Sequence, residues 1–167
     1  MPRFERLAAD HAVDGFVSGQ DDLDEWVRHA AWTADRAGTA RVYVWLSDAD
    51  EVIGYFAIAP HNIRREELPS AVGRGAPDVI PGYLLARLAV SESLQGRGHG
   101  GELLATALGT ILSAIRAGGG RVIVVDAVDD RARSFYEHFK FRPIPDNPHR
   151  LVMKASTAAA SLSLDWP

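Results

Sequence analysis

The residues with the clearest chemical potential in this sequence are a glycine-rich segment and one tyrosine, Tyr136. The segment reads Gln95-Gly96-Arg97-Gly98-His99-Gly100-Gly101 and lies between an apolar run and a helical pattern. Glycine lets a backbone approach a ligand closely, and unpaired N–H groups at the start of a helix attract anions. The sequence therefore predicts an anion site at residues 95–101, suited to a phosphate or a pyrophosphate.

The spacing of these glycines is compatible with a dinucleotide site. Gly96-x-Gly98-x-x-Gly101 matches the dinucleotide fingerprint, and the strand expected at 122–126 ends in an acid near the place of a ribose ligand. Three features oppose this interpretation. The glycines begin five residues after the preceding strand, an antiparallel hairpin precedes the unit, and the chain is short for two mononucleotide-binding halves. A glycine-rich turn without a ligand is a further alternative.

Tyr136 lies in a segment, residues 129–139, that is expected to form a short helix capped by an acid. Its phenol has a reference pKa of about 10, so it carries a proton at neutral pH and can act as a general acid. The alternative is a packing role, because Phe135, Tyr136 and Phe139 are also spaced to pack together. We favour the catalytic role because a buried hydroxyl needs a polar partner.

The elements expected around these residues form a mixed sheet flanked by helices. Apolar residues at helical spacing predict helices at 21–37, 102–117 and 129–139. Runs of β-branched and aromatic residues predict an antiparallel hairpin at 39–46 and 52–59, a central strand at 83–90, and strands at 122–125, 141–144 and 151–154. The order β-α-α-β-β-β-α-β-α-β-β indicates the α/β (α+β) class. Residues 60–81, rich in proline, are expected to form a long irregular connection.

Length and composition limit the remaining possibilities. A chain of 167 residues with 47% hydrophobic content is expected to form one domain, which we place at 1–154, followed by a tail at 155–167 that can be flexible. The absence of cysteine excludes disulfides, thiolate metal sites and a cysteine nucleophile. The histidines show no ligand spacing, so no metal is expected. No apolar run reaches membrane-spanning length, so we expect a cytoplasmic protein without a membrane partner.

The charge distribution leaves room for local phosphate contacts. A formal net charge of −4 argues against a generally basic nucleic-acid binder, but residues 131–154 are predominantly basic. Most of the cations are arginines, whose planar group suits phosphate. The candidates for phosphate contacts are Arg87, Arg97, Arg131, Arg133, Lys140 and Arg142. The alternative for each is a solvated surface charge.

The strand Leu85-Ala86-Arg87-Leu88-Ala89-Val90, followed by Gln95-x-x-Gly98-x-Gly100, resembles the acetyl-CoA motif of the GNAT N-acetyltransferase superfamily, (Arg/Gln)-x-x-Gly-x-(Gly/Ala). The resemblance implies the GNAT acyl-CoA N-acyltransferase fold and acetyl-CoA as cosubstrate. It implies that the backbone of Leu88, Ala89 and Val90 contacts the pantetheine. The pyrophosphate is then expected against Gln95, Gly96, Arg97, Gly98, His99, Gly100 and Gly101.

Further motifs, in the same order along the chain, resemble the GNAT toxins of type II toxin–antitoxin systems. They are Phe16-x-x-Gly19-x-x-x-Leu23-x-x-Trp26, Gly38-Thr39-Ala40-Arg41-Val42-Tyr43, Ile53-Gly54-Tyr55-Phe56-Ala57, Ile80-Pro81 and Ser134-Phe135-Tyr136-x-x-Phe139-x-Phe141. This resemblance implies acetyl transfer from acetyl-CoA to the α-amine of aminoacyl-tRNA, which blocks translation. It also implies Tyr136 as the catalytic acid, a ribbon-helix-helix antitoxin as partner, and a homodimer.

The sequence departs from this family at Lys140, where glycine is common at the end of a helix. The position suits a left-handed conformation, so lysine is expected to strain or alter the turn. It is also a candidate for a phosphate contact beside Tyr136.

No residue is a clear general base, although Glu92 or a chain of waters remains available. An aminoacyl ester amine titrates no higher than about 8, against about 10.4 for lysine, so the lack of a base fits aminoacyl-tRNA better. The alternatives are an acetyltransferase of small-molecule or protein amines without a toxin role, and a binding module without catalysis.

Overall fold

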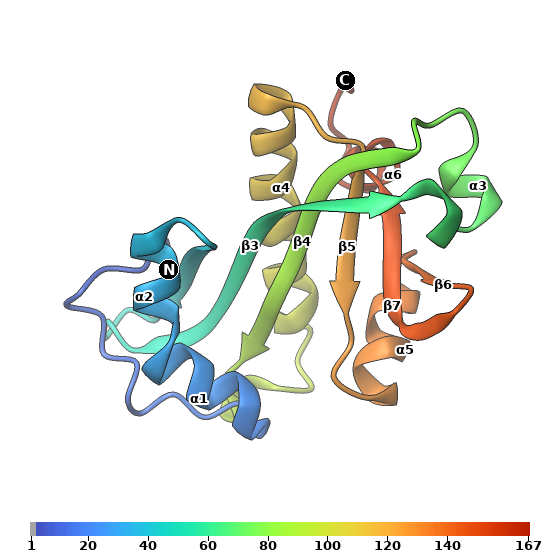
Figure 1. The fold of residues 1–167 in the computed structure, drawn as a ribbon. Helices are drawn as coiled ribbons and strands as arrows, with labels where there is room; N and C mark the ends of the chain where they lie inside the picture. Colours follow the sequence, from blue (N-terminus) through green and yellow to red (C-terminus); the bar gives the residue numbers. More distant parts are fainter. Residues whose placement is uncertain (1–2) are drawn as a thin grey trace. The chain divides into compact units, whose positions relative to one another are not determined.

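A computed structural model describes residues 3–167 of the protein (Figure 1). The strands are β1 (Arg3–Arg6), β2 (Arg41–Leu46), β3 (Val52–Arg64), β4 (Val79–Val90), β5 (Val122–Asp126), β6 (Arg142–Ile144) and β7 (Asn147–Lys154). The helices are α1 (Asp21–His29), α2 (Ala31–Ala37), α3 (Ser70–Gly73), α4 (His99–Gly118), α5 (Asp130–His138) and α6 (Ala155–Ser161). Two short 3-10 turns are η1 (Arg65–Glu67) and η2 (Glu92–Leu94).

Within the described residues, the strands form one seven-stranded sheet in the order β1-β2-β3-β4-β5-β7-β6. The pairs β1–β2, β2–β3, β5–β7 and β6–β7 are antiparallel, whereas β4 and β5 are parallel. The predicted α/β class with a mixed sheet is therefore confirmed. The chain divides into two compact units, one comprising the chain up to Ala59 together with Ala86–Ala107, the other Pro60–Leu85 with Leu108–Pro167.

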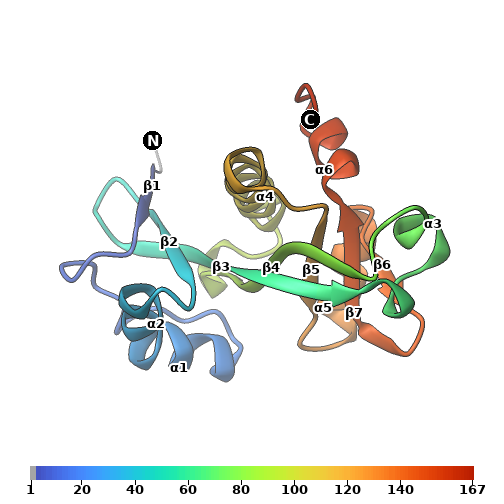
Figure 2. The ribbon, with the colours of Figure 1, turned by 45° about the horizontal axis from the view of Figure 1, so that its top comes forward.

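In the first unit, α1 and α2 lie side by side (Figures 1 and 2). The predicted hairpin is confirmed, since Arg41 to Leu46 of β2 pair with Val52 to Ile58 of β3. The single helix expected at 21–37 is wrong, because the chain breaks at Ala30, where φ is −121° and ψ is −27°. The break lets the buried carboxylate of Asp35 accept a hydrogen bond from the backbone N–H of Val42 at 2.9 Å.

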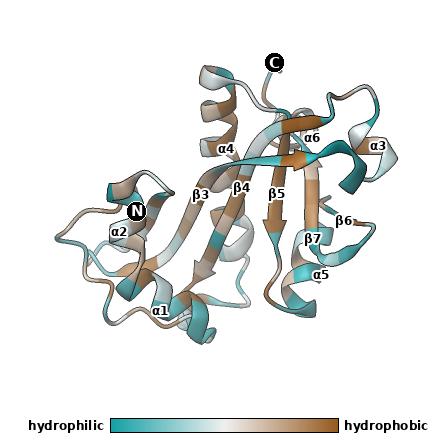
Figure 3. Ribbon diagram, viewed as in Figure 1, coloured by the Kyte–Doolittle hydropathy of each residue, from teal (hydrophilic) through white to brown (hydrophobic). Residues whose placement is uncertain are grey.

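In the second unit, β5 is apolar along most of its length (Figure 3). Its Val122 and Val124 pack in a core with Ile63, Ile80 and Val152. The long irregular connection expected at 60–81 is wrong: β3 continues to Arg64, β4 begins at Val79, and η1 and α3 lie between them. The ends of this shorter connection are joined because Arg65 N–H donates to the carbonyl of Asp78 at 2.9 Å.

The two helices that flank the candidate residues differ from the sequence prediction by at most three residues. α5 begins after Asp129, whose carboxylate accepts a hydrogen bond from the N–H of Ala132 at 2.8 Å, so the predicted acidic cap is confirmed. α4 begins at His99 rather than at Glu102, which places the last part of the glycine segment in the first helical turn. The tail at 155–167, where the sequence shows no clear pattern, contains α6.

Candidate acetyl-CoA and catalytic site

The glycine turn presents a run of unpaired backbone N–H groups. Gly96 and Gly98 have positive φ values of 79° and 82°, which alternate with ordinary conformations at their neighbours. Within residues 3–167, none of the six N–H groups from Gly96 to Gly101 donates a hydrogen bond to a protein acceptor. The free N–H groups, together with the dipole at the start of α4, make this turn suited to an anion.

The space beside the turn is open. A Cβ atom built on Gly96 or on Gly98 would meet no heavy atom within 4 Å. Both glycines are therefore required for their positive φ rather than for tight packing, since this conformation is costly for other residues. A pyrophosphate fits a turn with free donors and room in front of them.

The side chain of Gln95 fixes the start of the turn. Its amide nitrogen donates to the carbonyl of Ser18 at 2.6 Å and to the carbonyl of Val90 at 2.9 Å. A second link is made by the N–H of Glu92, which donates to the carbonyl of Val17 at 2.8 Å. The turn is thus attached both to the end of β4 and to the segment before α1, and the amide of Gln95 is engaged within the protein.

The strand that leads into the turn lies against a glycine on the neighbouring strand. Ala89 and Val90 are buried at the end of β4, and Leu88 is half-buried. A Cβ atom on Gly54 would lie 3.2 Å from the carbonyl oxygen of Ala89 and 3.1 Å from the ring of Trp45. Gly54 therefore permits the close approach that sets the position of the strand expected to contact pantetheine.

The two side chains inside the turn behave differently. Arg97 is exposed. The ring of His99 is half-buried and meets the ring of Trp45 edge-on, with centroids 5.5 Å apart. Its Nδ1 is buried without a hydrogen-bond partner among the described residues and lies 3.6 Å from a carboxylate oxygen of Glu102. Packing against Trp45 decides this orientation.

Tyr136 belongs to the second unit and is 6% exposed. Its ring contacts Phe135 and Phe141 edge-on, at centroid distances of 5.2 and 5.6 Å. Among residues 3–167 its hydroxyl has no hydrogen-bond partner. Burial raises the pKa of the Tyr136 phenol above its ordinary value, because the phenolate loses the solvation that water would give it. The group is therefore a protonated acid at any physiological pH.

The basic candidates are divided between the two units. Arg87 lies over the ring of Trp26 at 5.0 Å and donates to the carbonyl of Ala86 at 2.9 Å, so its guanidinium is held against the protein. Arg133 forms an ion pair with Glu137 at 2.9 Å. The exposed ones are Arg131, Lys140 and Arg142, which follow one another from α5 to β6. Arg131 and Arg133 share α5 with Tyr136.

Lys140 occupies the conformation that the sequence indicated. Its φ is +75°, in the left-handed region that favours glycine. Its N–H donates to the carbonyl of Glu137 at 3.0 Å, which closes the end of α5. The lysine is therefore strained at the turn between α5 and β6.

Sequence reasoning missed a polar cluster at the end of β5. Arg150 donates to both carboxylate oxygens of Asp126, at 2.7 and 2.8 Å, and its Nη1 lies 3.3 Å from Nε2 of His61. Burial lowers the pKa of His61, and the Arg150 guanidinium lowers it further. Because arginine only donates, Nε2 of His61 is an occupied acceptor and unsuitable as a base.

This cluster also removes the dinucleotide interpretation. The acid expected to hold a ribose, Asp126, is committed to Arg150 through two hydrogen bonds. Asp126 and Arg150 meet because they are partners in the register of β5 against β7. The sequence does not give that register.

The described residues contain no group of three or more histidine, cysteine, aspartate or glutamate side chains placed to hold a metal ion. A search of the helices within the same residues finds none long and apolar enough to cross a membrane.

Comparison with known protein families and sequences gives consistent matches. Residues 38–143 match the model of the acetyltransferase (GNAT) domain. The chain is 37% identical over 155 residues to the tRNA-acetylating toxin of Mycobacterium tuberculosis (strain ATCC 25618 / H37Rv), with 93% of each chain covered. It is 27% identical over 157 residues to the probable toxin TacT of Sinorhizobium fredii (strain NBRC 101917 / NGR234), covering 88% of this chain and 87% of the relative.

Solved structures show the same similarity in three dimensions. AtaT complexed with acetyl-methionyl-tRNAfMet matches with a TM-score of 0.88 and 26% identity, covering 96% of this chain and 99% of AtaT. A tyrosine-to-phenylalanine mutant of AtaT, bound to the C-terminus of the antitoxin AtaR and to acetyl-CoA, matches with a TM-score of 0.83 and 25% identity. That match covers 97% of this chain and 98% of the mutant.

Proposed function

The chain belongs to the GNAT acetyltransferase family, and from this premise we propose that it transfers acetyl from acetyl-CoA to the α-amino group of aminoacyl-tRNA. The observation that carries the choice of acceptor is the 37% identity, over 93% of both chains, to a tRNA-acetylating toxin. The free N–H groups of the glycine turn support the choice of donor, because they match the pyrophosphate of acetyl-CoA.

On the donor side, we assign the pyrophosphate to the N–H groups of Gly96 to Gly101. Leu88, Ala89 and Val90 then contact the pantetheine through their backbone, and N–H groups near Leu88 stabilise the oxyanion that forms during transfer. Arg97 adds a positive charge at the turn. Bound acetyl-CoA supplies the thioester from which the amine takes its acetyl group.

Tyr136 is the general acid in this proposal. Its hydroxyl donates a proton to the departing thiolate sulfur, for which it has no competing protein acceptor among the described residues. Because burial raises the pKa of Tyr136, the phenol carries its proton at neutral pH, as a general acid must before the transfer. The reaction needs no covalent enzyme intermediate, which agrees with a chain that contains no cysteine.

The attacking amine needs little help from the protein. An α-amine has a reference pKa of about 8, so much of it is neutral at physiological pH without a strong base. Glu92 is exposed beside the turn and remains the available carboxylate. The lack of a clear general base therefore favours an α-amine over the ε-amine of lysine. The ε-amine has a pKa of about 10.4 and would have to be deprotonated first.

The biological role that follows is a toxin that blocks translation by acetylating charged tRNA. We assign it a ribbon-helix-helix antitoxin as partner and a homodimeric state, on the family resemblance of the motifs described above. Since charged tRNA is a cytoplasmic substrate, we place its action in the cytoplasm. Its tRNA contacts are assigned to Arg87, Arg131, Arg133, Lys140 and Arg142.

The acceptor is tested directly with radiolabelled acetyl-CoA. The purified protein is incubated with charged tRNA, with the same tRNA after deacylation, with free amino acids, and with a lysine-containing peptide. We expect label on charged tRNA alone, and alkaline hydrolysis of the ester should release an N-acetyl amino acid. Label on the peptide or on free amino acids, with charged tRNA unlabelled, would reject the proposed acceptor while leaving the acetyltransferase assignment in place.

A further inference from the structure

A basic pocket lies in the second unit, apart from the glycine turn. Its volume is about 270 Å³, and three cationic side chains line it: Arg74, Arg121 and Lys154. It lies at the amino ends of β4 and β5, where Ile80 and Val122 form part of its apolar wall, whereas the glycine turn follows the carboxyl end of β4. None of these three cations belongs to the candidates derived from the sequence.

Strand register brings two of the cations together. Val122 of β5 is the partner of Lys154 in β7, and the N–H of Ala155 donates to the carbonyl of Arg121 at 2.9 Å. Arg121 and Lys154 therefore start from adjacent positions at the same end of two paired strands. Arg74 approaches from α3, and Figures 1 and 2 show α3 and α6 at this end of β5 and β7.

The cations of this pocket lack counter-charges. Among residues 3–167, no carboxylate lies within ion-pair distance of Arg74, Arg121 or Lys154, and none of the described residues that line the pocket is acidic. Such a cluster repels itself unless an anion joins it. The three cations of the pocket therefore attract an anion, and the described residues of the protein do not supply one.

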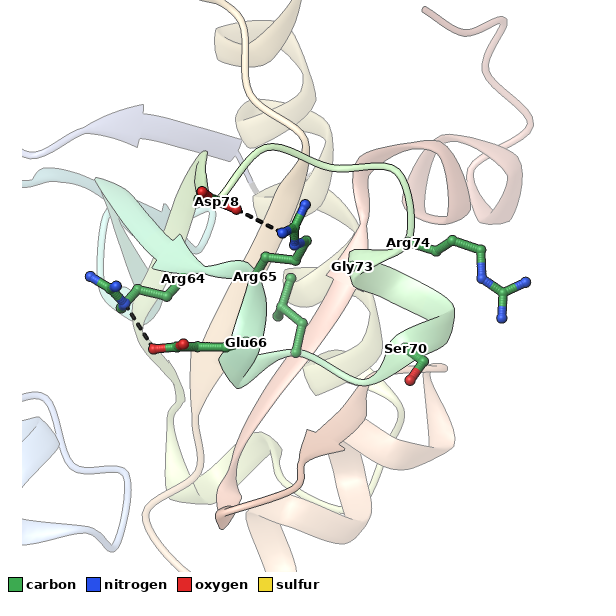
Figure 4. Close-up of a pocket in the computed structure, with 8 residues that line it drawn as sticks. Arg64, Arg65, Glu66, Ser70, Gly73, Arg74 and Asp78 are labelled. Atoms are coloured by element: carbon green, nitrogen blue, oxygen red, sulfur yellow. Dashed lines mark hydrogen bonds and ion pairs between the residues drawn. The ribbon is translucent and has the colours of Figure 1, made fainter.

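A neighbouring pocket shows the contrast. It has a volume of about 700 Å³, and two of its arginines are neutralised, Arg64 by Glu66 at 3.0 Å and Arg65 by Asp78 at 2.7 Å (Figure 4). Arg74 also borders that pocket, but in Figure 4 its side chain extends away from the paired arginines. The arginines of the neighbouring pocket are thus paired with carboxylates, whereas the cations of the basic pocket are not.

We propose that the basic pocket binds backbone phosphates of the tRNA substrate, an inference that rests on the proposed function. Two planar guanidinium groups and one ammonium group, arranged around an open pocket, can contact several oxygens of neighbouring phosphates at once. A single carboxylate would engage one guanidinium fork and leave the other cations unpaired.

The test compares two triple variants with the same loss of charge. One is R74Q/R121Q/K154Q, and the control is R3Q/R36Q/R64Q, which removes three arginines outside the basic pocket. Binding of deacylated tRNA is measured by fluorescence anisotropy from 50 to 200 mM salt, after circular dichroism has shown that both variants are folded. For the pocket variant, we expect binding about tenfold weaker at low salt. The salt slope should be smaller by about 2 to 3, since three cations are removed and each phosphate contact contributes roughly 0.9 to that slope. The control should stay close to the wild type.

Several results would overturn the inference. Equal losses in the two variants would mean that only overall charge matters. Unchanged tRNA binding in the pocket variant, together with lost binding of a poly-glutamate peptide, would assign the pocket to an acidic protein partner instead. Acetyl transfer to charged tRNA by the wild type is measured in parallel. If transfer occurs and the pocket variant matches the control, this inference alone fails; if the wild type transfers nothing to charged tRNA, the proposed function fails and the inference falls with it.

Discussion

The glycine turn and the helix that carries Tyr136 are built in opposite ways. In the turn, the side-chain amide nitrogen of Gln95 donates two hydrogen bonds within the protein, and the backbone N–H groups are left free. In α5, the backbone is fixed by the Asp129 cap, and the side-chain hydroxyl of Tyr136 is left free. In both regions the group expected to meet the substrate is the one that the protein does not satisfy.

The largest effect is expected from Tyr136→Phe. If the free hydroxyl is the general acid, its loss should lower the rate of acetyl transfer by about 10² to 10⁴ fold, the usual range for such a group. Stability should not fall, because the hydroxyl makes no hydrogen bond within the described residues. Single-turnover transfer to charged tRNA and chemical denaturation measure the two quantities. A variant that transfers acetyl at the normal rate would end the catalytic role of Tyr136.

Tyr55→Phe is the matched control, because the hydroxyl of Tyr55 is satisfied. It donates to the carbonyl of Leu23 at 2.7 Å in the core of the first unit. Its removal should cost about 1 kcal/mol of stability, since a buried hydrogen bond is lost, and should leave the rate of transfer nearly unchanged. If both variants lose activity equally, the contrast between a free and a satisfied hydroxyl has no functional meaning.

The next largest effect is expected from Gln95→Ala in the turn. The variant loses two hydrogen bonds that hold the turn on Ser18 and Val90, worth together about 1 to 3 kcal/mol, so acetyl-CoA should bind roughly tenfold more weakly. Isothermal titration with acetyl-CoA measures this affinity. Gln95→Glu, which keeps the size but loses the donor, should bind no better than Gln95→Ala. Wild-type affinity in both variants would show that the free N–H groups need no anchor.

The pH dependence of the rate tests the state of Tyr136. Because burial raises the pKa of this phenol above its usual value, the acid stays protonated where an exposed tyrosine begins to ionise. The rate should rise as the substrate amine loses its proton, at or below about pH 8, and then stay level to about pH 9.5. Rapid-quench transfer assays across this range avoid hydrolysis of the aminoacyl ester. A descending limb below pH 9.5 that disappears in Tyr136→Phe would show that the phenol ionises early and is poorly buried.

Local rules predicted much of the fold and of the candidate site. The helix at α5, its acidic cap at Asp129 and the β-branched hairpin need only neighbours in sequence, and they are confirmed. The position of the glycine turn between strand and helix is also a local property, and the structure has the turn between β4 and α4. The roles of Tyr136 and the glycine turn remain predictions until they are measured.

The features that could not be predicted from the sequence depend on contacts between residues that are distant in the chain. After the break at Ala30, the carboxylate of Asp35 accepts a hydrogen bond from the N–H of Val42, which lies on another element, β2. The pair of Asp126 with Arg150, and the basic pocket at Arg121, both depend on the register of β5 against β7. Register is set by the whole sheet and turns, so residues that are distant in sequence become neighbours without a local signal.

The smallest effect is expected at Lys140, which lies in the turn between α5 and β6. Its φ of +75° is strained for lysine, so Lys140→Gly should stabilise the protein by up to about 1 kcal/mol, the usual cost of a left-handed conformation less the flexibility that glycine adds to the unfolded chain. Lys140→Ala removes the same ammonium group but keeps the strain, so it should not stabilise. Denaturation of the two variants separates backbone strain from charge, and equal stability would show that the turn does not hold Lys140 in a strained state. Binding of tRNA completes the test: a phosphate contact from Lys140 predicts weaker binding in both variants, whereas a purely conformational role predicts no change in either.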